Sequence, residues 1–326
     1  MSELLPGGRE SNGRDLAPWS APPVWLADRM SQRVAISGAS GFIGSALSSY
    51  LVARGDDVRH LVRREARTGS EISWDPAQRR LDAGAFEDVD AVVHLAGAGV
   101  GDRRWSPGYK QEILASRTDG TSTVASAVAA HGDRIRLVSA SAVGWYGSDR
   151  GDEILTEQSP EGTGFLAEVA QAWEASTAAA SAVGAPVAMS RTGLVMSRKG
   201  GAFEPLVRLG RLGLAGPLGS GRQWWPWISL DDAIRALVFL VDRRDVLGPV
   251  NVVGPEPLHQ KQIVDEIGRQ LGRPTVLPAP GFALRAVLGE FAGEVTGSQR
   301  VVAARLRETG FEWVHGSISS AVAAIL

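Results

Sequence analysis

The stretch RVAISGASGFIGSALSSYLVARGDDVRHLVRR, residues 33–64, constrains the fold more than any other part of the chain. An apolar segment at 34–36 leads into three glycines, and apolar residues then recur at helical spacing, namely Ile43, Leu47 and Leu51. Gly55 is suited to end that helix, and residues 58–62 form a second apolar segment. This order predicts a strand, a glycine turn, a helix and a parallel strand, which together form a βαβ unit.

The glycines of this unit predict a phosphate-binding turn. Gly38 would allow the tight turn, Gly41 would let the backbone approach phosphates, and Gly44 would let the helix pack closely on the strand. The helix N-terminus offers free N–H groups and a positive dipole end to a pyrophosphate. The predicted cofactor residues are therefore Gly38, Ser40, Gly41, Phe42, Ile43 and Gly44. The alternative is a βαβ unit whose small-residue turn holds no ligand.

The residues after the second strand predict which dinucleotide binds. An acid at this position binds the ribose 2′-OH of NAD, whereas arginine suits the 2′-phosphate of NADP. Here Arg63 and Arg64 follow the strand, while Asp56 and Asp57 precede it. We therefore expect NADP as the cofactor. The alternative is that the two arginines belong to a solvated loop.

The rest of the chain alternates strand-like and helix-like stretches. Apolar segments such as VDAVVHLAGAGVGD and IRLVSASAVGWYG are separated by helical patterns near 107–130 and 164–183. This alternation predicts an α/β fold of Rossmann type, a doubly wound parallel sheet with its site at the carboxyl strand ends. The small residues Ala96 and Gly97 would let the cofactor pass one strand end, and Leu95 is predicted to contact the cofactor as well. We expect an NADP-binding domain at 31–197 plus 226–253, and a smaller substrate lobe at 198–225 plus 254–326.

The composition narrows the classes of partner. The 326 residues carry a formal net charge of −2, which favours neither nucleic acid nor an anionic membrane. There is no cysteine, and the five histidines are scattered, so we expect no metal site. No apolar run approaches the roughly 20 residues of a membrane span. We expect a cytoplasmic protein that acts on a small-molecule substrate. The sequence leaves open whether the protein forms a homodimer. Residues 1–30 predict a disordered tail without a signal peptide, and Met30 is an alternative start.

Several motifs resemble those of the extended short-chain dehydrogenase/reductase superfamily. The turn GASGFIG is similar to its cofactor loop, HLAG to its fourth-strand motif, and WISLDDAIRAL to a late strand-to-helix motif. RRWSPGYKQEILASR, GWYG, GPLGSGRQWWPWISLDD and a C-terminal VLGE…GF segment resemble an atypical subgroup, the SDR39U-type "epimerase family" with its DUF1731-like C-terminal segment. The resemblance covers residue 33 to the end and implies a Rossmann fold with NADP.

The catalytic pair of the larger superfamily is missing from the sequence. Its members carry Tyr-x-x-x-Lys at the start of the helix that begins here as GTGFLAEVAQAWE, where Phe165 and Glu168 stand instead. The chain's tyrosines are Tyr50, Tyr109 and Tyr146, and none has a lysine four places on. A phenol with its ordinary pKa of about 10 needs a nearby cation to exchange protons near pH 7.

Tyr146 and Ser141 are the remaining candidates for catalysis. Arg150 lies four residues after Tyr146, but the glycines around the two predict a loop, so their side chains need not meet. The resemblance places Tyr146 past a central strand and Ser141 at the active-site serine. Both would donate a hydrogen bond to a substrate oxygen. The alternatives are a structural aromatic that lines the cleft and a serine bonded to backbone.

Two residues of the helix at 107–130 complete the candidate site. Arg117 replaces an asparagine of the extended members and would supply a cation beside the nicotinamide ribose or the substrate, and Glu112 would approach the cofactor. The alternative for both is a solvated helix face. Trp224 and Trp225 either wall a substrate pocket or belong to the core, and Trp227 favours the core.

These observations favour an NADP-dependent oxidoreductase that acts on a small carbonyl or alcohol. Catalysis itself is open because the tyrosine–lysine pair is absent. A non-catalytic NADP(H)-binding redox sensor or scaffold is the alternative, and nucleotide-sugar epimerisation, which the family label suggests, is a third.

Overall fold

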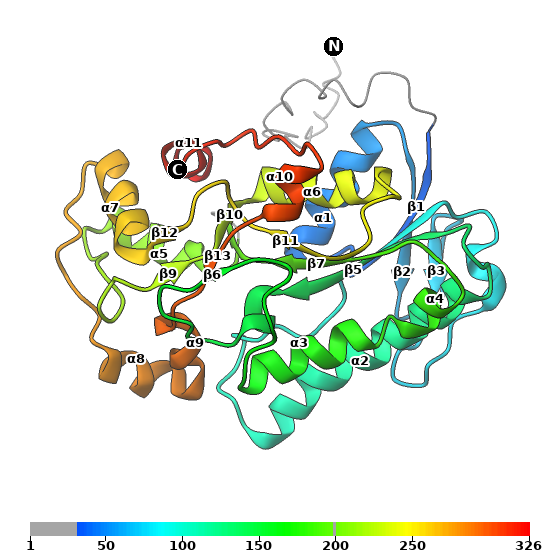
Figure 1. The fold of residues 1–326 in the computed structure, drawn as a ribbon, viewed down its shortest axis with the longest axis horizontal. Coiled ribbons are helices and arrows are strands. Elements are labelled where there is room, and N and C mark those ends of the chain that lie inside the picture. The colour runs from blue at the N-terminus through cyan, green and yellow to red at the C-terminus, as the bar shows by residue number, and fades with distance from the viewer. Residues whose placement is uncertain (1–30, 198–199) are drawn as a thin grey trace, which may run out of the picture. The chain divides into compact units, whose positions relative to one another are not determined.

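The central sheet places the glycine turn at a topological switch point. In the computed structural model, which describes residues 31–197 and 200–326, seven described strands form a parallel sheet in the order β11-β7-β5-β4-β1-β2-β3 (Figure 1). Their bounds are β1 (Arg33–Ser37), β2 (Asp57–Val62), β3 (Glu71–Ser73), β4 (Ala91–His94), β5 (Arg136–Ala142), β7 (Val187–Thr192) and β11 (Gly248–Val252). The chain proceeds outward from β1 to β3 and then returns to β4 on the other side. Ligands of such sheets bind at the carboxyl ends of the strands flanking this reversal.

Helices cover both faces of the sheet, as the alternating pattern predicts. On one face, α1 (Phe42–Ala53) packs against α6 (Leu230–Asp242). On the other lie α2 (Pro107–Ala129), α3 (Phe165–Ala175) and α4 (Ala178–Ala182) (Figure 1). The predicted doubly wound α/β fold is confirmed. The apolar residues of the strands, such as Val34, Ile36 and Val92, are fully buried between the two helical layers.

The helix predicted over residues 164–183 is divided in two. The Ser176 hydroxyl donates to the Ala172 carbonyl at 2.7 Å, and the Thr177 hydroxyl donates to the Glu174 carbonyl, also at 2.7 Å. These hydroxyls add hydrogen bonds to carbonyl groups in the last turn of α3, which ends at Ala175. The chain then turns and resumes as α4.

The later part of the chain builds a second hydrophobic core. It contains the helices α5 (Phe203–Arg211), α7 (Gln260–Leu271) and α11 (Ile318–Ile325), with Trp225 and Trp227 buried among them. Three short strand pairs belong to this region or join it to the sheet: β8 (Leu194–Met196) with β10 (Trp227–Ser229), β9 (Trp224–Trp225) with β12 (Leu258–His259), and β6 (Ile154–Leu155) with β13 (Arg300–Val301). Gln32–Leu326 form one unit, within which the predicted lobe boundaries stay a prediction. The predicted tail, 1–30, lies outside the described residues.

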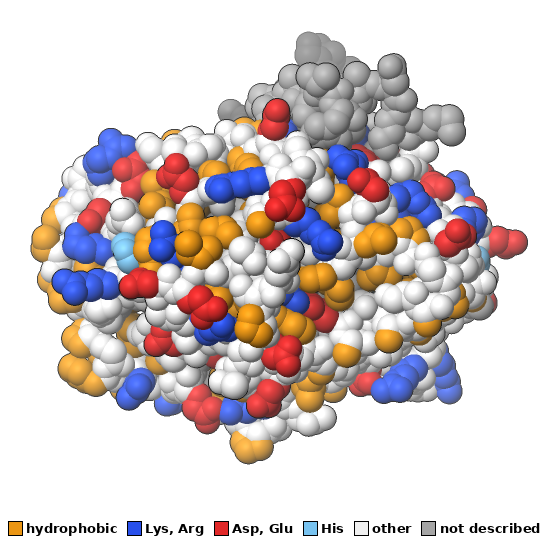
Figure 2. All heavy atoms as spheres, in the orientation of Figure 1, with side chains coloured by type: hydrophobic (Ala, Val, Ile, Leu, Met, Phe, Trp, Pro, Cys, Tyr) orange, Lys and Arg blue, Asp and Glu red, His pale blue; other side chains and the backbone are white. Residues whose placement is uncertain are grey.

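The remaining helices lie near the C-terminus. They are α8 (Gly281–Leu288), α9 (Ala292–Thr296) and α10 (Ala304–Glu308), together with the 3₁₀ turns η2 (Ala83–Phe86), η3 (Val143–Tyr146) and η4 (Gly289–Phe291). On the face shown in Figure 2, acidic and basic side chains are interspersed, and hydrophobic side chains gather near α8. Phe282 and Val287 of that helix are 78% and 71% exposed. No described helix is both long and apolar enough to span a bilayer.

Candidate functional site

The glycine turn between β1 and α1 has no room for side chains at two positions. Gly38 has φ +70°, and a Cβ there would lie 2.9 Å from the backbone nitrogen of Ala96. A Cβ at Gly44 would lie 2.1 Å from the carbonyl oxygen of Gly38. The turn therefore packs directly on the residues that follow β4, and α1 packs directly on the turn.

The N-terminus of α1 is open to an anion. Its N-cap is Gly41, and no side chain caps the first turn. N–H groups in this position lack intrahelical partners and lie at the positive end of the helix dipole. Ser40 and Gly41 are exposed, whereas Phe42 and Ile43 are half-buried. The residues present here fit a pyrophosphate group.

A buried serine–histidine pair holds the end of β4 beside this turn. The Ser37 hydroxyl lies 2.6 Å from His94 Nδ1 and accepts the N–H groups of Leu95 and Ala96 at 3.1 and 3.3 Å. Burial lowers the pKa of His94 to about 4, so the imidazole is neutral near pH 7. The predicted residues 95–97 are thus positioned by a contact that the sequence did not reveal.

The two arginines after β2 differ in their surroundings. Arg64 donates to both oxygens of Glu71, at 2.9 and 2.6 Å, and these hydrogen bonds lower the pKa of that carboxyl to about 2. Arg63 is exposed and makes no hydrogen bond or ion pair with any residue within 31–197 and 200–326. The charge of Arg64 is thus paired with the Glu71 carboxylate, whereas the guanidinium of Arg63 is accessible to a ligand.

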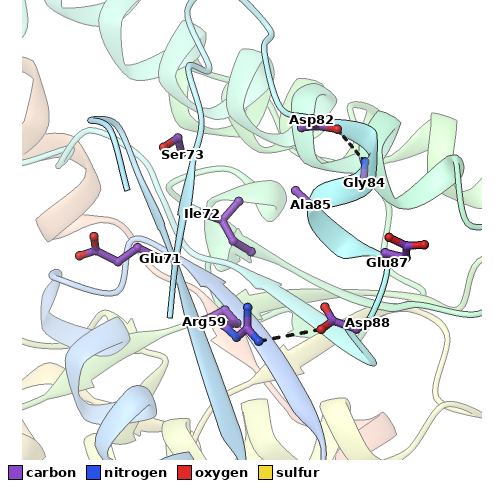
Figure 3. Close-up of a pocket in the computed structure, with 9 residues that line it drawn as sticks. All are labelled: Arg59, Glu71, Ile72, Ser73, Asp82, Gly84, Ala85, Glu87 and Asp88. Atoms are coloured by element: carbon purple, nitrogen blue, oxygen red, sulfur yellow. Dashed lines mark hydrogen bonds and ion pairs between the residues drawn. The ribbon is translucent and has the colours of Figure 1, made fainter. Parts of the chain in front are cut away.

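Arg63 lines a pocket of about 340 Å³ at the carboxyl ends of β2 and β3. The other lining residues are Arg64, Glu65, Ser73, Trp74, Asp75, Arg80, Leu81 and Asp82. A second hollow, of about 610 Å³, lies along the outer edge of β2 and β3 (Figure 3). In this hollow, Arg59 Nη2 lies 3.9 Å from Asp88 Oδ2, and the Asp82 carboxylate accepts the N–H of Gly84. These polar groups of the hollow thus interact with one another. It holds none of the predicted cofactor residues.

Arg117 lies beside the end of β4, as predicted. Its Nη1 donates to the carbonyls of Ala98 and Ile113 at 2.9 and 3.1 Å, and its guanidinium stacks over the Trp173 ring, 4.9 Å from the centroid. A Cβ at Gly97 would lie 3.4 Å from this side chain. Burial lowers the pKa of Arg117 to about 10, and no described carboxylate pairs with it. Arg117 is a desolvated cation that lacks an anion.

Glu112 does not share this environment. Its side chain is 52% exposed and lies 3.8 Å from Arg103 in a loose surface pair. The predicted approach of Glu112 to the cofactor has no supporting contact, and the alternative of a solvated helix face describes it better.

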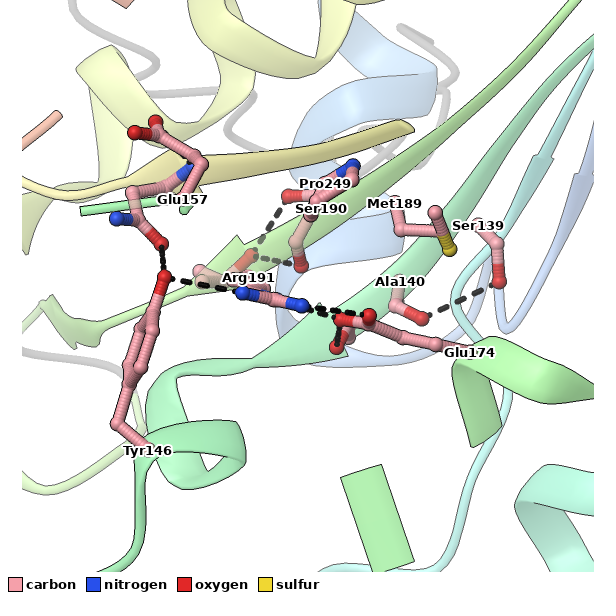
Figure 4. Close-up of polar contacts among 12 residues, drawn as sticks. Ser139, Ala140, Tyr146, Glu157, Glu174, Met189, Ser190, Arg191 and Pro249 are labelled. Carbon is pink, nitrogen blue, oxygen red and sulfur yellow. Dashed lines mark hydrogen bonds and ion pairs between the residues drawn. The ribbon is translucent and has the colours of Figure 1, made fainter. Parts of the chain in front are cut away.

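Tyr146 belongs to a buried polar network with Arg191 and Glu174 (Figure 4), and Ser141 joins it through Glu174. The Tyr146 hydroxyl donates to Asn251 Oδ1 at 2.7 Å and accepts a hydrogen bond from Arg191 Nη1 at 3.1 Å. Arg191 Nε and Nη2 donate to the two oxygens of Glu174 at 2.7 and 2.8 Å. The Ser141 hydroxyl donates to the same carboxylate at 2.6 Å. The network joins β5, η3, α3, β7 and β11.

This network occupies the hydroxyl groups of Ser141 and Tyr146, whose predicted catalytic roles stay predictions. The two side chains are 4% and 0% exposed, and each hydroxyl proton is directed at a protein acceptor. Burial raises the pKa of Tyr146, and the nearby charge of Arg191 only opposes this in part. Both hydroxyls therefore bond to protein groups in this structure, as polar groups buried in an interior usually do.

The Tyr146–Arg150 spacing does not form a dyad. Arg150 Nε and Nη2 pair with Glu153 at 2.9 and 2.8 Å, and Nη1 donates to the backbone oxygens of Tyr146 and Pro160, at 3.2 and 3.3 Å, not to the phenol. The cation beside the phenol is instead Arg191, from β7. Burial works to lower the pKa of Arg191, but the hydrogen bonds and charge of Glu174 outweigh this and raise it.

The three tryptophans of QWWPW join separate segments rather than line an open pocket. Trp225 Nε1 donates to the Val295 carbonyl at 3.1 Å, and Trp227 Nε1 to that of Glu256 at 2.9 Å. Trp224 Nε1 donates to a carboxylate oxygen, Asp152 Oδ1, at 2.7 Å. One face of the Trp224 ring lies against His259, and Arg300 also stacks on the ring. The core alternative therefore applies to Trp225 as well as to Trp227.

The C-terminal segment reaches the loops at the carboxyl edge of the sheet. Glu290 of η4 pairs with Lys110 at the start of α2. Gln299 Nε2 donates to the carbonyls of Val143 and Gly147, on either side of Tyr146, at 3.1 and 2.5 Å. These contacts fix the loops after β4 and β5 from the side opposite the glycine turn.

Comparisons of the sequence and the structure with known proteins agree with the fold and the glycine turn described above. Residues 34–254 match the model of the NAD dependent epimerase/dehydratase family. The chain belongs to this family. Residues 279–325, which include η4 and Gln299, match a domain of unknown function, DUF1731. The resemblance to the SDR39U-type proteins is confirmed as well.

Three relatives illustrate the match. An epimerase family protein of Mycobacterium leprae is 41% identical over 290 residues, which cover 89% of this chain and 94% of that one. The human epimerase family protein SDR39U1, isoform 2, solved with NADPH, superposes with a TM-score of 0.81 at 30% identity, over 90% of this chain and 98% of that one. A structure from Corynebacterium glutamicum, described as a nucleoside-diphosphate sugar epimerase, gives 0.75 at 33% identity. It covers 90% of this chain, which spans only 58% of that longer protein.

Sequence reasoning missed Arg191, Glu174 and Asn251. They lie 45, 28 and 105 positions from Tyr146 and carry no motif of their own. The one available signal is that an arginine and a glutamate inside apolar segments are rarely buried unless paired.

Proposed function

We propose that the protein binds NADP(H) and transfers hydride between its nicotinamide and a small carbonyl or alcohol in the cytoplasm. The observation that carries the cofactor assignment is Arg63, an unpaired arginine at the end of β2, on the same edge of the sheet as the open N-terminus of α1. Membership of the family and the NADPH of the human relative support it.

The chain's own residues divide the task of holding the cofactor. Gly38 and residues 40–44 would bind the pyrophosphate through backbone N–H groups, and residues 95–97 would let the cofactor pass the end of β4. Arg63 would bind the 2′-phosphate. When bound, the nicotinamide would supply or accept the hydride.

Arg117 is the group that we assign to the reacting end. It is desolvated, lies against Gly97, and has no anionic partner among the described residues. A cation in such a place would stabilise negative charge on a ribose or substrate oxygen, because charge interactions strengthen where water is excluded. Ser141 and Tyr146 would act through the network as positioning residues that hold η3 and β5 in place.

The cofactor assignment is tested by calorimetric titration of NADPH and NADH. The wild type should prefer NADPH, and Arg63→Ala should weaken NADPH binding by about 1.5–3 kcal/mol, the value of a hydrogen bond to a charged group, with NADH unchanged. Equal affinity for the two cofactors would contradict the NADP assignment. Hydride transfer is tested by loss of NADPH fluorescence across a panel of carbonyl compounds.

A second candidate is a non-catalytic NADP(H)-binding sensor or scaffold. The observation that favours it is the buried network, which takes both hydroxyls away from a substrate. Tight NADPH binding without turnover across the panel would support this candidate. A third, nucleotide-sugar epimerisation, rests on the description of the Corynebacterium glutamicum relative. Including nucleoside-diphosphate sugars in the panel tests it.

A further inference from the structure

A short, rigid hairpin follows β3 and forms part of the pocket that Arg63 lines. Asp75 and Arg80 exchange two backbone hydrogen bonds, each of 2.8 Å, which close the turn between them. The Asp75 carboxylate also accepts the N–H of Gln78 at 3.1 Å. Arg79 takes a left-handed conformation, with φ 54°, which few residues other than glycine adopt. The position of Arg80 is therefore set by the backbone of a closed turn.

The two arginines of this hairpin have different surroundings. Arg79 Nη2 donates to Asp119 Oδ1 on α2 at 2.9 Å. Arg80 lines the pocket instead, and its side chain has no hydrogen bond or ion pair in the part of the chain that the structure describes. The hairpin thus ties one guanidinium to the protein and presents the next one to the same pocket as Arg63.

Among the described residues, no carboxylate around the pocket forms an ion pair with Arg63 or Arg80. Asp75 and Asp82 each accept a backbone N–H of their own turn, from Gln78 and Gly84. Glu71 is taken by Arg64. Glu65 also lines the pocket and pairs with neither Arg63 nor Arg80. The guanidinium groups of Arg63 and Arg80, which each donate several hydrogen bonds and have no partner among the described residues, suit an anion with several acceptor oxygens. A phosphate has such oxygens, whereas a ribose hydroxyl does not.

We propose that Arg80 is the second arginine of the NADP site and that it binds the 2′-phosphate jointly with Arg63. The inference rests on the proposed cofactor and deepens it by naming a specificity residue from outside the strand–turn–helix unit. Arg64, held by Glu71, shapes the pocket wall and does not bind the phosphate.

The test compares ligands that differ only in the 2′-phosphate. The full chain is titrated calorimetrically with NADPH, NADH, 2′,5′-ADP and 5′-AMP. Arg80→Ala should weaken NADPH and 2′,5′-ADP about tenfold or more, with NADH and 5′-AMP unchanged. Arg80→Lys should recover part of the loss because it keeps the charge but not the fork. Arg79→Ala is the matched control and should leave all four affinities as in the wild type.

Two outcomes would overturn the proposal, and they differ from failure of the cofactor assignment. If Arg80→Ala binds NADPH like the wild type while Arg63→Ala does not, Arg80 plays no part in the site. If Arg80→Ala weakens NADH as much as NADPH, its effect is not on the 2′-phosphate. If the folded wild type shows no preference for NADPH, the cofactor assignment itself fails, and the proposal with it.

Discussion

Replacement of Arg191 by methionine tests whether the buried network holds the carboxyl edge of the sheet together. The Arg191 and Glu174 side chains are 3% and 7% exposed and share two short hydrogen bonds. Without the guanidinium, the Glu174 carboxylate keeps only the Ser141 hydroxyl as a side-chain donor, and the Tyr146 oxygen loses a donor. The variant therefore leaves a buried charge without its counter-ion.

The expected cost follows from this geometry. Removal of one partner of a buried ion pair typically costs about 3–5 kcal/mol, because the remaining charge stays desolvated. For a large domain, in which 1 kcal/mol shifts Tm by about 2–4 °C, this corresponds to a fall in Tm of roughly 6–20 °C. The free energy of unfolding is measured by urea denaturation followed by circular dichroism.

Two further variants make the result interpretable. Arg150→Ala breaks an outer pair, whose Arg150 and Glu153 side chains are 18% and 48% exposed, and should cost less than about 1 kcal/mol. Arg191→Met combined with Glu174→Leu removes both charges and should be more stable than Arg191→Met alone. The reasoning is refuted if Arg191→Met costs no more than Arg150→Ala, or if the two network substitutions simply add.

Three other predictions concern single charged groups. Arg117→Ala should weaken NADPH binding by about 1.5–3 kcal/mol without lowering Tm, because an unpaired buried cation costs folding free energy; calorimetry and melting curves check both, and a lower Tm with unchanged affinity would mean a structural role. The hydrogen bond that His315 donates to Asp231 raises the pKa of His315, so its contribution to stability is complete below the ordinary value of 6.5 and disappears as pH rises through the raised pKa. His315→Gln should flatten that part of the stability–pH curve, and an unchanged curve would exclude His315 as its origin. Lys110→Met removes an exposed pair and should change the free energy of unfolding by less than about 1 kcal/mol; a larger loss would show that η4 depends on this contact.

The glycine turn shows what local sequence can predict. Gly38 and Gly44 lie within one βαβ unit, and their requirement for small size comes from neighbours only a few residues away or on an adjacent strand. Strand and helix spacing then predicted the parallel sheet and its two helical layers. The position of Arg117 came from the family resemblance instead, and the structure places its side chain against Gly97, after β4.

Tyr146 shows where such reasoning stops. The sequence places its ring just past a central strand, which is correct, but not the direction in which the hydroxyl points. Asn251 and Arg191 arrive from β11 and β7, which become neighbours of β5 only once the sheet has formed. The partners of the buried Tyr146 hydroxyl are therefore distant in sequence.

The sequence by itself determined the α/β architecture, the tight glycine turn and the family, because these depend on short-range periodicity and on backbone conformations that only glycine adopts readily. Tertiary structure alone decided which charges are neutralised. Arg64 is paired by Glu71 of the adjacent strand, whereas Arg63 and Arg80, which no sequence spacing brings together, line one pocket and pair with none of the residues that the structure describes. The physical reason is that an ion pair needs contact within about 4 Å, and in a sheet such contacts are set by strand order and register, not by distance along the chain.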